Sequence, residues 1–536
     1  MPVLSKPNPP SPTPINFQME LVESFNDGEN TKNENDKIKK EEFQTVENLI
    51  YKKNNAEVRN GFSELLEISD NYGLLMHRHK DGNQLLCVRL NSAGLSKLTR
   101  IDRTTAALTD KTLAITGSGQ PQGVSLRDYL YFVNGAENLI RIYDGATGYT
   151  TVTDGAFATP ILSVATINGR LWACTKNLLK FSKLGSGVVS SFDATIPPLT
   201  TGLDRGGTAS STIEKMVGIV GAGKTLVLFG ENNIETHSIP EIQGGLTSLD
   251  ANLTTLKLEV PGYGITSKWA CCIVGDSVYF AEKRGFFKMN ILYGTIKKLD
   301  KNQEYHRSLN YDNCQMAYDN TNDTIYFSAT DSLKNNIVQA YNIELNAFSV
   351  FPNFFIQSWA VDKQNIYFSR STDKKVCDGF VEGLYTDVGE KINYKLLSSA
   401  TDNKTIKYFK RTGRMILDFM NYGYDSIVYK FYADRIQGGT KTPSFTHTIK
   451  TLKADQGQPL GGGIGGFGIS PWGMAGVDFD AIQNQEKIST NPRINTKYIR
   501  AEIELSGATS KKLMIRRLGF EWRKSRLKTK DTTFNQ

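Results

Sequence analysis

The sequence has few cysteines, no long apolar run and no apolar leader. Six cysteines are spread over 536 residues, too few for a fold held together by disulfides, so we expect reduced thiols in the core. No stretch approaches the roughly 18 consecutive apolar residues of a spanning helix, so the sequence predicts no membrane span. Because the N-terminal residues lack the apolar core of a signal peptide, we expect no secretory export.

Excess charge is confined to one segment. The chain carries 63 Lys and Arg against 55 Asp and Glu, a formal net charge of +8. Residues 497–530 hold eleven bases and three acids, which accounts for the whole excess, so the remainder of the chain sums to zero. This distribution argues against a general affinity for polyanions along the chain.

A repeat of short apolar strands fills the middle of the chain. Between about residues 80 and 385, a turn residue is followed by an apolar strand with an aromatic or branched centre, and a fainter copy covers Leu85–Val88. The clear centres are 41 to 55 residues apart: Tyr131, Trp172, Val227, Tyr279, Tyr326 and Tyr367. Flanking apolar segments bring each unit to about four short antiparallel strands, as in a propeller blade.

This repeat predicts an all-β fold with a β-propeller of six to seven blades over residues 76–389. A single four-stranded blade leaves both faces exposed, and packing blades around a ring covers them. A long β-sandwich or a pair of Greek-key domains is the alternative, because the spacing is uneven. At about 150 residues per domain, length alone would predict three to four domains.

The N-terminal part differs from the repeat. Residues 1–20 are rich in proline, and we expect an extended arm there. In the next segment, residues 21–75, apolar residues recur at helical spacing within residues 41–51: Phe43, Val46, Leu49 and Ile50. This spacing predicts one short amphipathic helix.

The C-terminal part, residues 390–536, contains longer strands that partly alternate apolar and polar residues. Ile427–Tyr432, Tyr498–Leu505 and Lys512–Trp522 follow this pattern, and a glycine-rich stretch, Gly461–Gly473, interrupts it. We expect a separate β-sandwich-like domain with a basic end.

Two glycine patterns imitate nucleotide-binding motifs. Gly218–Thr225 fits the phosphate-loop pattern, but the residues that follow from Leu226 predict a strand where a phosphate loop needs a helix. Gly463–Gly468 fits the dinucleotide pattern, but Pro471 follows and no βαβ unit frames it. We therefore expect no nucleotide and no other cofactor.

The sequence has no clear catalytic constellation. His77 and His79 are spaced to lie on one face of a strand, but no third ligand is near, which favours a surface pair over a zinc site. No nucleophile-elbow pattern occurs, and Ser371–Asp373 fits the turn motif of sialidase-like propellers only in part. We predict no catalytic, cofactor-binding or metal-binding residues and no enzymatic activity.

Basic and aromatic residues are interleaved near the C-terminus. Seven bases form the candidate set that faces DNA or a partner: Lys511, Lys512, Arg516, Arg517, Arg523, Lys524 and Arg526. Such a set suits the nucleic-acid backbone, an electrostatic and sequence-independent contact. A solvated strand face with a charged tail, or docking onto an acidic partner, fits the same pattern.

Short motifs at both ends of the chain resemble those of a known family. Phe25–Thr31, Phe43–Leu49 and Ala56–Phe62 are similar to an opening in which a G-x-N-T segment precedes a short helix and an R-x-G-F turn. Tyr498–Arg500 and Leu513–Arg516 are similar to its closing strands. On these residues the chain resembles the tail hub or nozzle proteins of short-tailed bacteriophages, also described as packaged-DNA stabilisation or tail tubular proteins.

The resemblance implies a fold and a role. The fold would be a β-propeller with a platform domain assembled from both chain ends, here residues 21–75 and 390–536. Six copies, a homohexamer, would ring a central channel beneath the portal and adaptor proteins and retain the packaged genome. The ring would pass double-stranded DNA non-specifically at ejection and hold tail fibres or spikes. The protein would be made in the host cytoplasm and reside in the virion tail.

Two other functions fit the sequence. One is a carbohydrate- or receptor-binding β-propeller without catalysis. The other is a propeller hydrolase, whose paired carboxylates the sequence alone does not locate.

Overall fold

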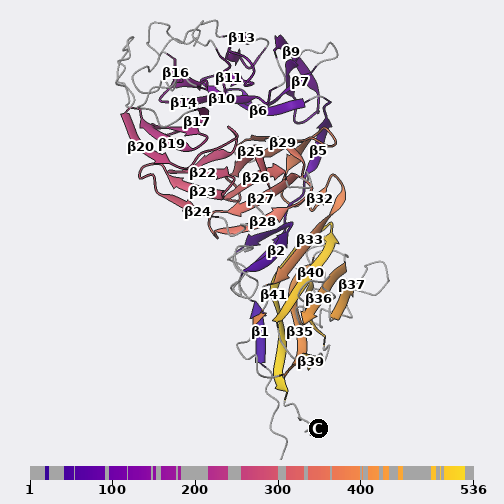
Figure 1. Ribbon diagram of the computed structural model, residues 1–536. Helices are drawn as coiled ribbons and strands as arrows, with labels where there is room; N and C mark the ends of the chain where they lie inside the picture. The colour runs from indigo at the N-terminus through magenta and orange to yellow at the C-terminus, as the bar shows by residue number, and fades with distance from the viewer. Residues whose placement is uncertain are drawn as a thin grey trace, which may run out of the picture.

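A computed structural model of the chain contains strands and turns, and no helix occurs in the part that it describes (Figure 1). The described residues are 18–22, 42–52, 55–69, 71–90, 96–116, 119–146, 149–151, 159–176, 179–182, 215–239, 255–299, 309–330, 336–362, 365–398, 401–402, 409–421, 426–433, 445–450, 484–490, 495–496 and 500–525. Figure 1 shows a broad body at the top and a narrower one below it.

Seven small antiparallel sheets follow one another along the chain and form the broad body. The first four consist of β6 (Asn71–His79), β7 (Gly82–Leu90), β8 (Ser96–Ile101) and β9 (Leu108–Ile115); β10 (Gln122–Leu126), β11 (Tyr129–Val133), β12 (Arg141–Tyr143) and β13 (Tyr149–Thr151); β14 (Ser163–Ile167), β15 (Arg170–Cys174) and β16 (Leu179–Phe181); and β17 (Met216–Ala222), β18 (Thr225–Gly230), β19 (Asn233–Ser238) and β20 (Thr255–Pro261). The last three consist of β21 (Cys271–Val274), β22 (Ser277–Glu282), β23 (Gly285–Asn290) and β24 (Ile296–Lys298); β25 (Asn310–Asp319), β26 (Thr324–Thr330), β27 (Asn336–Asn342) and β28 (Ala347–Phe351); and β29 (Ile356–Val361), β30 (Ile366–Arg370), β31 (Lys375–Gly379) and β5 (Ser63–Glu67).

The seven sheets form a closed ring. Their first strands contact one another in the order β6, β10, β14, β17, β21, β25 and β29, and β29 contacts β6 again. This arrangement is a β-propeller, and its seven blades lie within the predicted range of six to seven. The predicted aromatic or branched centres lie on the second strand of their blades and are all buried: Tyr131, Trp172, Val227, Tyr279, Tyr326 and Tyr367.

The ring is closed by a strand from the N-terminal side. β5 pairs with β31 and supplies the outer strand of the seventh blade. We expected the propeller to begin at residue 76, but β5 and β6 place its start at Ser63. The physical reason is that β31 would otherwise be an unpaired edge, and a strand from before the first blade covers that edge and ties the two ends of the ring together.

Local sequence sets the hairpins between blade strands. Asn168 and Gly169, with φ of 48° and 70°, connect β14 to β15. A two-residue turn with both φ values positive matches the twist of the flanking strands, and Asn-Gly adopts it at low cost.

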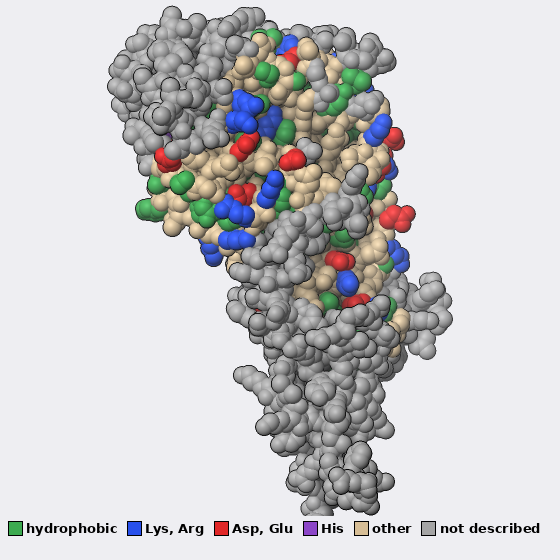
Figure 2. Space-filling model, in the orientation of Figure 1, with side chains coloured by type: hydrophobic (Ala, Val, Ile, Leu, Met, Phe, Trp, Pro, Cys, Tyr) green, Lys and Arg blue, Asp and Glu red, His purple; other side chains and the backbone are tan. Residues whose placement is uncertain are grey.

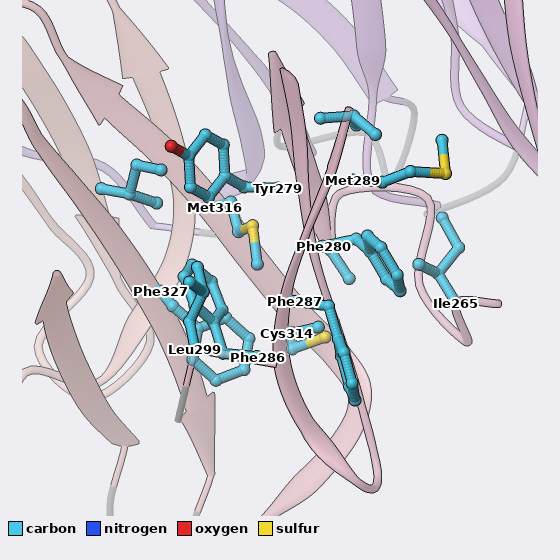
Figure 3. Packing of buried hydrophobic residues seen from close by; sticks show 14 of the residues in the cluster. Ile265, Tyr279, Phe280, Phe286, Phe287, Met289, Leu299, Cys314, Met316 and Phe327 are labelled. Atoms are coloured by element: carbon cyan, nitrogen blue, oxygen red, sulfur yellow. The ribbon is translucent and has the colours of Figure 1, made fainter. Parts of the chain in front are cut away.

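Two successive aromatic residues of β23, Phe286 and Phe287, pack on opposite faces of the fifth-blade sheet. Phe286 contacts Tyr341 and Phe348 of the sixth blade, with ring centroids 5.6 and 5.8 Å apart. Phe287 stacks on Phe280 at 5.4 Å on the other face of the sheet. Figure 3 shows these rings pointing to both sides of the strand. Phe280 in turn lies 5.9 Å from Phe229 of the fourth blade, so these rings join the fifth blade to both of its neighbours.

The narrow body, which we call the platform, is a sandwich of two mainly antiparallel sheets. One sheet contains β3 (Leu49–Lys52), β4 (Asn55–Val58), β41 (Leu513–Ser525), β35 (Phe409–Asn421) and β38 (Asn484–Thr490), with β1 (Gln18–Val22) on β41 and β39 (Asn495–Thr496) on β35. The other contains β2 (Phe43–Glu47), β33 (Glu390–Ser398), β40 (Arg500–Thr509), β36 (Ser426–Ala433) and β37 (Phe445–Lys450), with β32 (Thr386–Asp387) on β33 and β34 (Thr401–Asp402) on β40. Strands from the two chain ends pair with each other in both sheets, which confirms the platform built from N- and C-terminal segments.

Apolar side chains from both sheets fill the platform core. Leu49, Leu417 and Phe431 are buried there with Leu505 and Phe520. The Phe431 and Phe520 rings meet across the sandwich at 5.4 Å and 66°. Because these residues come from both ends of the chain, the platform forms only when the two ends associate.

The short helix expected at residues 41–51 is wrong, because the segment forms β2 and β3. Between Phe43 and Thr45 the pairing with β33 shifts by one residue, so Gln44 is a bulge and both Phe43 and Val46 face the core. Asn48, with φ of 55°, then breaks the strand before Leu49. The bulge and the break give apolar spacings of three residues, which imitate a helix.

The propeller and the platform share hydrogen-bonded strands. β2 pairs in parallel with β28, the outer strand of the sixth blade, through Glu47 and Val350. The backbone N–H of Asn48 also donates to the carbonyl oxygen of Val350 at 2.9 Å. One sheet therefore continues from the sixth blade into the platform (Figure 1).

Candidate functional site

Arg59 lies at the joint where the chain passes between platform and propeller. Its side chain is 2% exposed and makes a bidentate ion pair with Asp387, at 2.9 and 2.5 Å. Arg59 Nε also donates to Asn48 Oδ1 at 2.8 Å. The guanidinium lies over the rings of Phe351 and Phe354, 5.3 and 4.6 Å from their centroids. The Arg59 side chain thus connects two segments to the sixth blade. One leads from the platform into the propeller, and the other, which contains Asp387, leads back to the platform.

The backbone of the joint is packed without free space. A Cβ on Gly61 would lie 2.0 Å from the carbonyl oxygen of Thr386, so only glycine fits there. The next residue, Phe62, forms a parallel bridge with Asp387 and packs its ring against Phe354 and Phe368. Residues 59–62, which lead from the platform into the propeller, are therefore closely packed against residues 380–389, which lead back.

A pocket of about 270 Å³ lies beside the joint. Its walls come from the platform, with Lys52 and Asn60, and from the sixth blade, with Asn322 and Glu344. Tyr326 and Phe380 also line it, but their rings stack on each other at 4.2 Å and are almost fully buried. No open aromatic face is offered to a sugar among the described lining residues, so we assign the pocket no ligand.

The predicted basic residues lie on or beside β41, in the platform. Lys511 and Lys512 precede the strand, and Arg516 and Arg517 lie within it. Lys512 Nζ is 3.9 Å from Glu57 Oε2 of β4. Arg523 and Lys524 belong to the same strand, while their side chains and all of Arg526 lie outside the described residues. The structure therefore places the described members within β41 or directly before it.

A bulge directs both arginines outward. The pairing of β41 with β35 shifts between Asp418 and Phe419, so Arg516 and Arg517 together face Asp418 in register. Ile515 before them and Leu518 after them are buried, whereas Arg516 is half-buried and Arg517 is exposed. Without the extra residue, one arginine would point into the core.

The strand register adds bases that the sequence does not place near this set. Lys410 and Arg411 of β35 lie opposite Lys524 and Arg523 of β41. The backbone register therefore brings four basic residues to the same end of this sheet. Sequence analysis missed this because the two strands are distant in the chain.

The outer face of the second platform sheet carries alternating charges. Lys430 Nζ donates to Glu504 Oε1 at 2.8 Å, and Tyr432 Oη donates to Glu504 Oε2 at 2.9 Å. Burial alone would raise the pKa of Glu504, but these two hydrogen bonds lower it below its usual value. Burial raises the pKa of Glu47 on the same face, with Lys395 opposing and Glu504 reinforcing the shift.

The histidine pair is not on the surface as expected. His77 is fully buried because β10 of the second blade covers β6; its Nδ1 lies 3.1 Å from Ser125 Oγ, and its ring contacts Tyr143. Burial and the neighbouring His79 lower the pKa of His77 to about 4. The described residues contain no group of three or more His, Cys, Asp or Glu that could hold a metal ion.

The phosphate-loop pattern lies on a blade hairpin. Gly218–Thr225 covers most of β17 and the turn to β18, and Gly223 takes φ of 58° in that turn. A strand follows where a phosphate site requires a helix N-terminus. The segment at Gly463–Gly468 lies outside the described residues.

Comparison with known proteins finds only distant structural likenesses. No protein-family model matches the chain, and no curated protein matches it. It is similar to the solved structure of a streptogramin B lyase, at 14% identity over 60% of this chain and 97% of that one, with a TM-score of 0.38. U3-55K is similar at 10% identity over 60% and 98%, with a TM-score of 0.41. A catalytically inactive virginiamycin B lyase from Staphylococcus aureus reaches 13% identity over 60% and 99%, with a TM-score of 0.37.

These likenesses are too weak to indicate a function. Two of the similar proteins are lyases by name, but identities of 10–14% carry no catalytic residue to this chain. A search of the described residues finds no helix long and apolar enough to cross a membrane.

Proposed function

We propose that the chain is a structural protein of a virion, the tail hub or nozzle of a short-tailed bacteriophage. Six copies form a ring around the DNA channel below the portal and adaptor proteins. The ring retains packaged DNA, passes it at ejection and holds fibres or spikes. The protein acts in the tail after synthesis in the host cytoplasm, and it has no catalytic role or cofactor.

The main support for this proposal is the platform, whose sheets contain strands from both ends of the chain. It is the arrangement that the resemblance implies, and Ala56–Phe62, one of the motifs behind that resemblance, contains Arg59, Gly61 and Phe62 of the joint. A ring of identical chains needs two different surfaces held at a fixed angle on each subunit. A platform that shares a sheet with the propeller supplies such a rigid subunit.

The charge distribution suits a wall around moving DNA. The chain outside residues 497–530 is neutral, so it would not hold DNA tightly along the channel. The bases of β41 and of the facing end of β35 form the local positive region. We propose that this region meets DNA or an acidic partner in the tail.

Depletion of the protein during infection tests this role against the receptor-binding alternative. Particles assembled without the chain should package DNA and then lose it, and the wild-type chain supplied in trans should restore retention. Particles that keep their DNA but no longer attach to the host would contradict the hub and support a receptor-binding protein.

A further inference from the structure

The outer edge of the fifth blade is strongly basic. Residues 283–298 contain five bases and no acid: Lys283, Arg284, Lys288, Lys297 and Lys298. The near-zero sum over the rest of the chain conceals this local excess. Figure 2 shows Lys and Arg side chains gathered over the part of the propeller that holds β22–β24.

Strand register brings two of these lysines together. Lys288 of β23 lies directly opposite Lys297 of β24. Like charges opposite each other across an antiparallel pair destabilise it. Lys298, the next residue, faces the opposite side of the sheet, with its Nζ 5.9 Å from the centre of the Phe287 ring. We call Lys288 and Lys297 the lysine edge.

Arg284 does not belong to this edge. Its guanidinium forms an ion pair with the Glu282 carboxylate, with Nη2 2.5 Å from Oε1. The guanidinium carbon also lies over the Tyr263 ring, 4.6 Å from the ring centroid. Its charge is therefore already matched within the blade.

An apolar tip projects from the same two strands. Leu292 is 50% exposed and Tyr293 is 76% exposed in the turn between β23 and β24. The only other exposed large hydrophobic residue in the described part of the chain is Leu108, on the first blade. An exposed Leu-Tyr pair four to five residues from the lysine edge places apolar and cationic groups on the same hairpin.

The tip is held in a fixed shape. Asn290 Oδ1 accepts hydrogen bonds from the backbone N–H groups of Leu292 and Tyr293, at 3.0 and 3.1 Å. The N–H of Gly294, with φ of 65°, donates to the carbonyl oxygen of Asn290 at 2.8 Å. The backbone that carries both apolar side chains is therefore already ordered before binding.

We propose that this edge of the fifth blade binds the surface of an anionic lipid bilayer. Tyr293 and Leu292 enter the interfacial layer, where tyrosine has an apolar and a wet side. The lysine edge meets lipid phosphates, and its long side chains reach them from beside the tip. This binding is independent of the tail role proposed above.

Other ligands match only half of the surface. The backbone of duplex DNA would neutralise Lys288 and Lys297 but offers the aliphatic side chain of Leu292 no apolar surface. An apolar groove on another protein would cover the tip but leave the opposed lysines unmatched. A bilayer interface supplies both chemistries, an apolar layer and lipid phosphates, side by side.

The expected binding is peripheral and depends on salt. Each lysine near an anionic surface contributes about fivefold to the partition coefficient. The two lysines of the edge therefore predict a preference of about 25-fold for anionic over neutral vesicles. Salt of about 1 M shortens the screening length to about 3 Å and should abolish most of that preference.

Co-sedimentation of the full chain with vesicles tests the proposal. The probes are phosphatidylcholine vesicles with and without phosphatidylglycerol. The wild-type chain should bind the anionic vesicles, and Lys288→Glu with Lys297→Glu should weaken binding at least about 25-fold. Lys80→Glu with Lys224→Glu, at exposed hairpins of other blades, carries the same charge change and should bind as the wild type does.

A second measurement reports on the tip. Tyr293→Cys labelled with an environment-sensitive fluorophore should shift to shorter wavelength on anionic vesicles and be quenched by brominated lipid. Leu292→Ser with Tyr293→Ser should weaken binding without removing its salt dependence. Unchanged vesicle binding by the Lys288/Lys297 variant, an unshifted label, or binding to duplex DNA but not to vesicles would overturn the proposal.

Discussion

Arg59 and Asp387 are 328 residues apart in sequence, yet their side chains form a bidentate ion pair between propeller and platform. The ion pair joins the segment that enters the propeller to the segment that returns to the platform. Arg59 is almost fully buried, whereas a quarter of the Asp387 side chain is exposed. This asymmetry decides which partner is costly to lose.

Asp387→Asn should destabilise the protein more than Arg59→Met does. The asparagine variant leaves a buried guanidinium without its carboxylate, which costs about 3–5 kcal/mol. In the methionine variant water reaches the exposed side of the carboxylate, and the loss should be smaller. The free energy of unfolding in urea measures both. Equal losses, or a stable Asp387→Asn protein, would show that the pair does not hold the joint.

Gly61→Ala should disrupt the joint through its backbone. The added Cβ would lie 2.0 Å from Thr386 O and 2.6 Å from Thr386 C, and neither atom can move aside as a flexible side chain can. We expect a loss of at least about 3 kcal/mol and faster proteolysis within residues 380–389. Gly275→Ala is the control, since its φ of 57° is strained but nothing lies within 4 Å of the new Cβ. It should cost about 1–2 kcal/mol.

Lys268 should make the stability of the propeller depend on pH. Its ammonium group donates to the carbonyl oxygen of Leu162 at 2.8 Å and lies 4.4 Å from the Trp269 ring centre. Burial lowers the pKa of Lys268 from 10.5 to about 8. Between these values the unfolded chain binds more protons than the folded chain, so stability rises with pH over that window.

Lys268→Met should remove this dependence. Relative to the methionine variant, the wild type should gain up to about 3 kcal/mol between about pH 8 and pH 10.5. Thermal unfolding across this range measures the difference, with Lys224→Met at an exposed hairpin as the control. A constant difference between wild type and Lys268→Met would mean that the lysine is charged equally in both states.

Arg516→Glu with Arg517→Glu should spare the fold and impair the assembled particle. Both side chains point away from the platform core because of the bulge opposite Asp418. We expect little change in thermal stability of the isolated chain but a loss of particle assembly or genome retention. Lys80→Glu with Lys224→Glu is the charge-matched control on the propeller. Normal yield and DNA retention in the arginine variant would assign the cluster to ordinary surface.

The repeat of blade strands could be predicted because it is local. Tyr131, Tyr279 and Tyr367 lie at the centres of short apolar strands, and all three are buried on the second strands of their blades. The faint copy at Leu85–Val88 proves to be the second strand of the first blade. Seven copies of the pattern therefore correspond to seven blades.

Features that depend on register or on distant pairing could not be predicted. The bulge at Gln44 makes β2 imitate a helix, and only its pairing with β33 reveals the extra residue. β5 belongs to the last blade because of its bonds to β31, which the sequence places far away. The opposition of Lys288 and Lys297 likewise depends on the register of β23 and β24. The Ala56–Phe62 motif was visible, but its partners in residues 380–389 were not.

Electron microscopy of the chain mixed with the portal and adaptor proteins of the same virus tests the central claim most directly. Two-dimensional class averages should show a six-fold ring attached below the adaptor, with the platforms side by side around the channel. A chain that stays monomeric beside portal and adaptor, at concentrations where those two proteins assemble with each other, would contradict the tail hub.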